Sequence, residues 1–80
     1  MLRKSIHSPR QRELLALLRS TRDEAGLSQS ELARRLAKPQ SFVSKYEAGE
    51  RRIDIVELEQ ICKALGVPLS EFVRRFENGR

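Results

Sequence analysis

Residues 27–47, LSQSELARRLAKPQSFVSKYE, contain the pattern that decides the fold. Ser28 followed by Glu31 three positions later is the capping-box pattern of a helix start. Pro39 disfavours helical geometry at the residue before it and suits the first turn of a new helix, which we expect over about 39–48. The stretch therefore predicts two short helices joined by a tight turn.

The side chains of these two helices separate into an inward and an outward face. The inward face, which holds the helices together, is expected to comprise Leu32, Ala33, Leu36, Val43 and Tyr46. The outward face of the second helix carries hydrogen-bonding groups without an acid, namely Gln40, Ser41, Ser44 and Lys45. In a helix-turn-helix that reads DNA, the second helix lies in the major groove, where glutamine can bind adenine, lysine can reach guanine and serine can bond to a base or a phosphate. These four residues are the candidate base-reading positions.

Basic residues flank the same stretch, at Arg34, Arg35, Lys38, Arg51 and Arg52. Of these, Lys38, Arg51 and Arg52 are candidate phosphate contacts. The same geometry also occurs in purely structural helical hairpins, and polar residues face water on any surface helix. The polar face, the basic flanks and the spacing together favour DNA reading over that alternative.

The segment before this stretch predicts one amphipathic helix. Ser8 followed by Pro9 is typical of an N-cap with proline at the first helical position, and Gly26 ends the helix. Its apolar positions at helical spacing are Leu14, Leu15 and Leu18.

The segment after the stretch predicts two more helices. Asp54 and Glu57 repeat the capping-box pattern, and Pro68 begins a last helix that ends near residue 77. The inward stripe of the fourth helix comprises Leu58, Ile61, Cys62 and Leu65. No segment predicts a credible strand. The fold class is therefore all-α, a compact five-helix bundle that contains a helix-turn-helix.

The length of 80 residues and the hydrophobic content of 39% allow one compact core and a single domain. We expect a basic arm over 1–11, the folded domain over 12–77 and a short tail over 78–80. The first twelve residues supply four of the five net positive charges through Arg3, Lys4, Arg10 and Arg12. Such an arm is either a solvated, flexible leader or a segment that lies along phosphates or in a minor groove.

Catalytic, cofactor and membrane functions are not expected. His7 is the sole histidine and Cys62 the sole cysteine, and no glycine-rich phosphate loop or metalloprotease motif occurs. We expect Cys62 to be a small core residue and His7 to have no function. No apolar run approaches the ~20 residues that span a bilayer, and no signal peptide is recognisable, so we expect a cytoplasmic protein.

Three motifs identify a family. They are GLSQ-x-ELA at 26–33, SFVSKYE-x-GER at 41–51 and ICKALGV at 61–67. Together they resemble the Xre/Cro/phage-repressor family of bacterial and phage helix-turn-helix domains, which are lambda-repressor-like, over roughly residues 12–76. The resemblance implies a transcriptional regulator, expected to be a repressor, that binds palindromic operators as a homodimer.

The resemblance also assigns individual residues. The family's phosphate-contacting glutamine at the start of the second helix corresponds to Gln29, and its base-reading positions to Gln40, Ser41, Ser44 and Lys45. An arginine of the first helix often pairs with the glutamate that ends the third, and these positions hold Arg22 and Glu47. We expect that pair to support the fold without touching DNA. The sequence departs from the family at Ala37, where glycine is common because the turn favours a left-handed backbone.

Dimerisation follows from the size of the recognition helix, because one short helix contacts few base pairs and specificity usually comes from two half-sites ~34 Å apart. The last helix offers Leu69, Val73 and Phe76 as candidates for either the core edge or the dimer seam. An alternative function is a protein-interaction module, such as an antitoxin or adaptor whose main partner is a toxin or another regulator. In that case DNA binding would be secondary.

Overall fold

The computed structural model describes residues 8–79 and confirms the all-α class. Its elements are α1 (Pro9–Glu24), α2 (Gln29–Leu36), α3 (Gln40–Glu47), α4 (Ile55–Leu65) and α5 (Leu69–Glu77). No strand occurs among these described residues. Residues 1–7, which make up most of the expected basic arm and include His7, lie outside the described part. Residues 9–11 of that arm form the first turn of α1.

Three of the five helices begin with the side-chain caps that their sequences predict. The Ser8 hydroxyl accepts a hydrogen bond from the Gln11 N–H and so caps α1. Capping boxes start α2, with Ser28 and Glu31, and α4, with Asp54 and Glu57.

The other two helices, α3 and α5, begin one residue later than expected. Pro39 and Pro68 are their N-cap residues and not their first helical residues, and neither provides a side-chain cap. Both prolines have extended ψ angles, 154° and 142°, so the helical backbone starts at the following residue.

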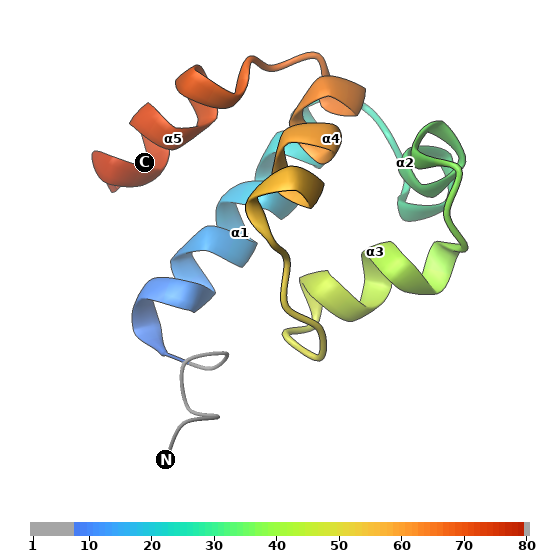
Figure 1. Cartoon of the computed structure of the whole chain (residues 1–80), viewed down its shortest axis with the longest axis horizontal. Coiled ribbons are helices and arrows are strands. Elements are labelled where there is room, and N and C mark those ends of the chain that lie inside the picture. The colour runs from blue at the N-terminus through green and yellow to red at the C-terminus, as the bar shows by residue number, and fades with distance from the viewer. Residues whose placement is uncertain (1–7, 80) are drawn as a thin grey trace.

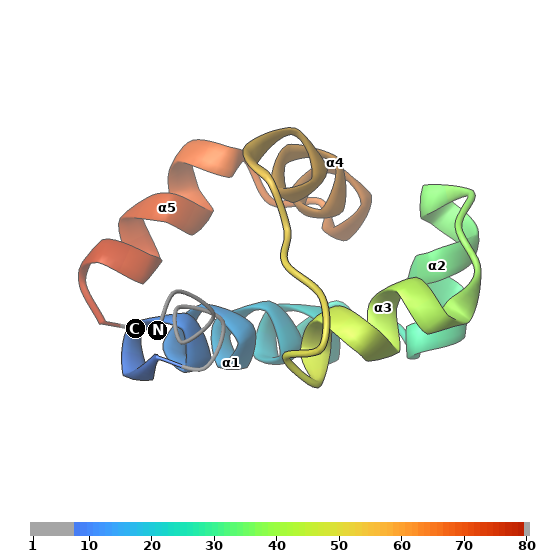
Figure 2. The same ribbon diagram turned by 60° about the horizontal axis from the view of Figure 1, so that its bottom comes forward.

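The helices form two groups along the molecule (Figure 1). α1 runs through the length of the fold, with α4 and α5 on one side, while α2 and α3 pack against each other at the end nearer the C-terminus of α1. α2 also contacts α4, and α3 contacts α1. Figure 2 shows the segment between α3 and α4 as an extended connection from the foot of α3 up to α4. This arrangement leaves one side of α3 open.

The core joins all five helices. Its buried hydrophobic residues are Leu15, Leu18, Leu32, Ala33, Phe42, Val43, Tyr46, Ile61, Cys62, Leu65 and Phe72. Leu14, Leu36 and Leu58, which were expected to face inward, are only partly buried at its edge. Cys62 is buried as expected, and burial raises the pKa of its thiol to about 11, so it is protonated at neutral pH.

Tyr46 is the largest fully buried side chain and carries a polar atom into the core. Among the described residues, none hydrogen-bonds to its hydroxyl. Burial in this apolar setting raises the pKa of Tyr46. An unpaired buried hydroxyl costs on the order of 1–3 kcal/mol, so the ring of Tyr46 stabilises the domain while its hydroxyl works against it.

The turn between α2 and α3 keeps the left-handed geometry that glycine would favour. Ala37 has φ 58° and ψ 41°, and it is the only described residue other than glycine with a positive φ. Its N–H donates to the Arg34 carbonyl oxygen at 3.1 Å, and the Lys38 N–H donates to that of Ala33 at 3.0 Å. These two bonds are the Schellman motif, which satisfies the last carbonyls of α2 and holds alanine in a conformation that costs it about 1 kcal/mol.

Ala37→Gly is therefore expected to raise the free energy of unfolding by about 1 kcal/mol, because glycine adopts the left-handed region without strain. Urea denaturation measures this change. Ala25→Gly is the matched control, since Ala25 also ends a helix but has φ −76°. That change should lower stability by about 0.5 kcal/mol. A loss of stability in Ala37→Gly would show that the strain is absent.

Candidate nucleic-acid interface

The open side of α3 carries the predicted base-reading residues. Gln40, Ser41 and Lys45 are exposed, whereas Ser44 is half-buried. The Ser44 hydroxyl donates to the carbonyl oxygen of Ser41 at 3.3 Å, within the helix itself. The opposite side of α3 buries Phe42, Val43 and Tyr46, so the helix is fixed to the core and presents a polar surface outward.

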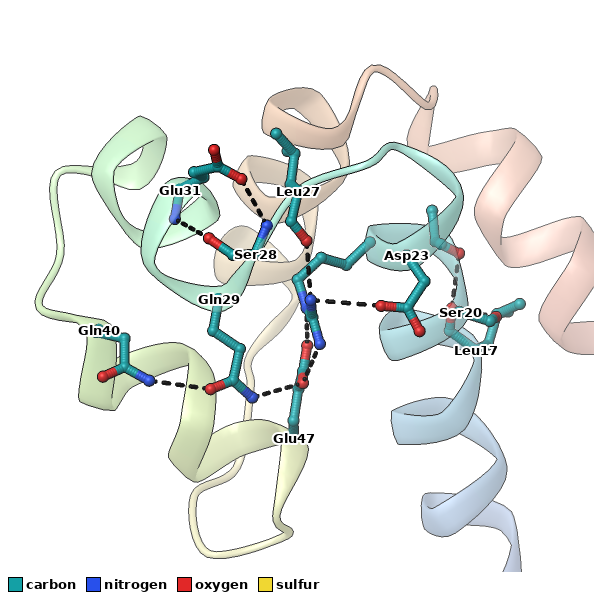
Figure 3. A network of polar contacts seen from close by, with 11 residues as sticks. Leu17, Ser20, Asp23, Leu27, Ser28, Gln29, Glu31, Gln40 and Glu47 are labelled. Atoms are coloured by element: carbon teal, nitrogen blue, oxygen red, sulfur yellow. Dashed lines mark hydrogen bonds and ion pairs between the residues drawn. The ribbon is translucent and has the colours of Figure 1, made fainter.

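A direct hydrogen bond joins the starts of α2 and α3. The Gln40 side-chain amide donates from Nε2 to Oε1 of Gln29 at 3.0 Å. Figure 3 shows the two side chains meeting in the space between the helices. In the sequence analysis, Gln29 is expected to contact a phosphate and Gln40 a base. In the structure, a hydrogen bond joins these two side chains.

The Arg22 and Glu47 side chains form a buried bidentate ion pair between α1 and α3. Arg22 donates from Nε to Glu47 Oε2 at 2.7 Å and from Nη2 to Oε1 at 3.0 Å. Its Nη1 donates to the Leu27 carbonyl oxygen at 2.8 Å. The two side chains are only 9% and 5% exposed. Hydrogen bonding to Glu47 raises the pKa of Arg22, so the arginine stays charged at all accessible pH values.

Glu47 also binds Gln29 and so connects the ion pair to the outward face. The Gln29 Nε2 donates to Glu47 Oε1 at 2.9 Å, which leaves Gln29 Oε1 to accept from Gln40 (Figure 3). A carboxylate can only accept hydrogen bonds, so the charge on Glu47 fixes which way the Gln29 amide points. The orientation of the Gln40 amide follows, and its Oε1 is not used in this chain of bonds.

Two of the predicted phosphate contacts meet at one aromatic ring of α3. The Lys38 ammonium lies 5.3 Å and the Arg51 guanidinium 4.6 Å from the centre of the Phe42 ring. Phe42 in turn makes an edge-on contact with Tyr46, with ring centres 5.5 Å apart. Cation–π attraction therefore holds two positive charges beside α3, one from the turn before this helix and one from the loop after it.

Arg51 has a second set of contacts in the loop before α4. Its Nη2 donates to Glu57 Oε2 at 2.8 Å and its Nη1 to Glu57 Oε1 at 3.1 Å. Hydrogen bonding between the two raises the pKa of Arg51 and lowers that of Glu57. The pKa of Glu31 is also lowered, but chiefly by the hydrogen bond that its carboxylate accepts from the Ser28 backbone N–H. The glutamates of both capping boxes are thus charged at neutral pH.

The residues expected at a dimer seam lie elsewhere, on α5. Leu69, Val73 and Phe76 are each partly buried, while Phe72 of the same helix is fully buried. The Arg10 guanidinium of α1 stacks 3.9 Å from the Phe76 ring centre, and its Nη2 donates to the Phe76 carbonyl oxygen at 3.1 Å. α5 is thus tied to the start of α1, and part of its apolar side stays accessible.

Two features of the interface were not predicted from the sequence. Phe42 was assigned to neither face of α3, although an aromatic residue with basic residues four positions before it and in the following loop is a possible signal of cation–π contacts. The hydrogen bonds that link Gln29 to Gln40 and Glu47 were also missed. They join residues 11 and 18 positions apart and have no local sequence signal.

Within the described residues, no three His, Cys, Asp or Glu side chains are grouped so that they could hold a metal ion. No helix among residues 8–79 combines the length and apolar character needed to cross a membrane.

Comparisons with known proteins agree with one another. Residues 18–72 match the model of a family described as helix-turn-helix. An XRE-family like protein from Pseudomonas syringae pv. tomato has a similar structure, with a TM-score of 0.85 and 43% identity over 96% of this chain and 94% of that one. The clp gene regulator ClgR from Corynebacterium glutamicum has a TM-score of 0.77 and 25% identity over 90% of this chain and 92% of its own.

A curated relative gives a similar result over a shorter match. It is described as an uncharacterized transcriptional regulator in the ATPase CF(0) region of Rhodospirillum rubrum, and it is 39% identical over 62 residues. The match covers 78% of this chain and 57% of the relative, so the chain spans little more than half of that protein's length.

The buried ion pair gives a direct test of this geometry. Arg22→Met is expected to lower the free energy of unfolding by about 3–5 kcal/mol, because it leaves the Glu47 carboxylate buried without its counter-charge. Arg74→Met is the matched control, since Arg74 pairs with Glu71 but its side chain is 68% exposed, and its loss should cost less than about 1 kcal/mol. Equal effects in urea denaturation would contradict the structural role of the Arg22 pair.

Proposed function

The chain belongs to the Xre-type helix-turn-helix family, and on this basis we propose that it is a transcriptional regulator that binds double-stranded DNA at specific sequences. α3 enters the major groove as the recognition helix, and Gln40, Ser41, Ser44 and Lys45 contact the bases. Binding of this kind needs no catalytic group or cofactor. The regulator is encoded by a bacterium or a phage and acts in the bacterial cytoplasm, where the DNA is accessible.

The observation that carries this proposal is the chain of hydrogen bonds from Arg22 to Gln40. A flexible glutamine on a surface helix loses conformational entropy when it binds a base. Here Gln29 and Glu47 already hold the Gln40 amide in one orientation, so less entropy remains to be lost. A preorganised amide that presents a carbonyl oxygen and an N–H along one edge is suited to the bidentate contact with adenine. A purely structural hairpin has no need of such support.

In this proposal the protein also contacts the phosphate backbone of the DNA. Gln29 lies at the N-terminal end of α2, where free N–H groups and the positive end of the helix dipole favour a phosphate. Lys38, Arg51 and Arg52 supply positive charge on both sides of α3. The net charge of +5 adds long-range attraction to DNA.

We further propose that two copies bind a palindromic operator and repress the adjacent promoter. The two-fold seam lies on α5 at Leu69, Val73 and Phe76, where apolar surface stays accessible in the single chain. A second exposed apolar pair, Ile55 and Val56, lies at the start of α4, where these residues are 63% and 57% exposed. The two surfaces lead to different dimers and can be separated by substitution.

Selection of binding sites from random DNA tests the core of the proposal. We expect one palindromic sequence to be enriched, and binding to a labelled duplex of that sequence to weaken steeply between two salt concentrations because several phosphates are contacted. Gln40→Ala should relax the preference at one base pair in each half-site and cost about 1–3 kcal/mol there. Failure to enrich any sequence, with no salt dependence, would disprove DNA reading.

The dimer seam is tested by analytical ultracentrifugation. Val73→Glu is expected to convert the dimer to a monomer, because a charge placed in an apolar seam is costly to bury. Val56→Glu is the matched control and should leave the dimer intact, since an acid in the first turn of α4 also suits the helix dipole. If Val56→Glu gives a monomer and Val73→Glu does not, the dimer interface lies on α4. If the unsubstituted protein is a monomer, the proposed dimer is disproved.

A further inference from the structure

Arg51 is held on several sides before any ligand binds. Its guanidinium stacks on Phe42, its Nη1 and Nη2 together grip the Glu57 carboxylate, and Nη1 also donates to the Arg52 carbonyl oxygen at 2.8 Å. Glu57 is itself fixed, because its Oε1 accepts from the Asp54 N–H at 3.1 Å in the α4 capping box. A long side chain in an exposed loop is thereby restricted to one position.

These contacts leave one edge of the guanidinium available. None of the hydrogen bonds described above uses Nε, and the second N–H of Nη2 points to the same side as the Nε–H. Two parallel N–H groups on a planar fork match the oxygens of a phosphate in a bidentate contact. The Arg51 side chain is 38% exposed, so solvent reaches the group although most of its surface is covered.

We infer that Phe42 and Glu57 are positioning residues that hold Arg51 as a preformed two-pronged contact for a DNA phosphate beside the recognition helix. This inference rests on the DNA binding proposed above and adds two residues to it. The carboxylate of Glu57 supports binding by fixing the fork, although its charge repels DNA. The preformed fork makes the contact in one geometry only, so it also fixes how far α3 enters the groove.

If Glu57 positions Arg51, removing its charge should weaken DNA binding, whereas net charge alone predicts tighter binding. Glu57→Gln raises the net charge of +5 by one, which by charge alone would tighten DNA binding. If Glu57 positions Arg51, the same change weakens binding by about tenfold and lowers the slope of log K against log salt by about 0.9, the value for one lost phosphate contact. The probe is a fluorescently labelled duplex of the selected operator, and the readout is anisotropy at several salt concentrations.

Glu59→Gln is the matched control. Glu59 is an exposed acid on the same helix, so the substitution adds the same charge without touching Arg51 and should leave binding equal or slightly tighter. In an Arg51→Ala background, Glu57→Gln should no longer weaken binding, because the group that it positions is gone. If Glu57→Gln behaves like Glu59→Gln in the unsubstituted protein, the inference is overturned.

Phe42→Leu provides a second route that leaves the α4 cap intact. It removes the aromatic platform under Arg51 and Lys38, so the salt slope should fall by up to about 1.8 while the base preference at the Gln40 position is kept. Thermal unfolding of each variant confirms that it is folded at the temperature of the titration. An unchanged slope in folded Phe42→Leu contradicts the inference. If the unsubstituted protein itself does not bind DNA, the proposed function is disproved instead.

Discussion

The buried Arg22–Glu47 ion pair is the constraint on which the geometry of this domain depends. It ties α1 to α3 directly, and the remaining donors of Arg22 and acceptors of Glu47 reach Leu27 and Gln29 at the start of α2. Three helices therefore meet at two charged side chains that are almost completely buried. Burying charge is expensive unless each group is paired, and here the hydrogen bonds between Arg22 and Glu47 also fix α1 and α3 relative to each other.

This constraint matters most for α3, which has eight residues and no side-chain cap. A helix of that length is unstable alone, so both its existence and its direction come from tertiary contacts. Phe42, Val43 and Tyr46 fix its inner side by packing, and Glu47 fixes its end by charge. On the polar outer side, the only side-chain hydrogen bond described above that reaches another helix is the one from Gln40 to Gln29. Because the inner side of α3 makes the structural contacts, a fold with one small core can present a rigid polar surface on the outer side of this helix.

The sequence predicted most of the architecture, because caps, prolines and apolar spacing are local signals. The helix number, three side-chain caps and the inward position of Tyr46 all came from such signals. The left-handed backbone at Ala37 follows the family's turn geometry although the residue is not the usual glycine. The Arg22–Glu47 pair came from family resemblance and not from the pattern. The features that the sequence did not predict depend on side-chain orientation. Phe42 and Val43 are neighbours on a short helix, where helical periodicity cannot assign both to the buried face. The direction of the Gln29 amide is set by the Glu47 carboxylate, 18 residues away.

The uneven distribution of helix caps has a consequence for the order in which parts of the domain open. α1, α2 and α4 begin with side-chain hydrogen bonds that hold their first turns without help from the core, whereas α3 and α5 begin at prolines and keep their shape only while packed. Local opening should therefore cost least at α5, which buries only Phe72, and its amide hydrogens should exchange with solvent sooner than those of α1 and α4. The helix proposed to read DNA also lacks a side-chain cap, but the buried side chains of Phe42, Val43 and Tyr46 and the Arg22–Glu47 ion pair hold it, so it should open only together with the core.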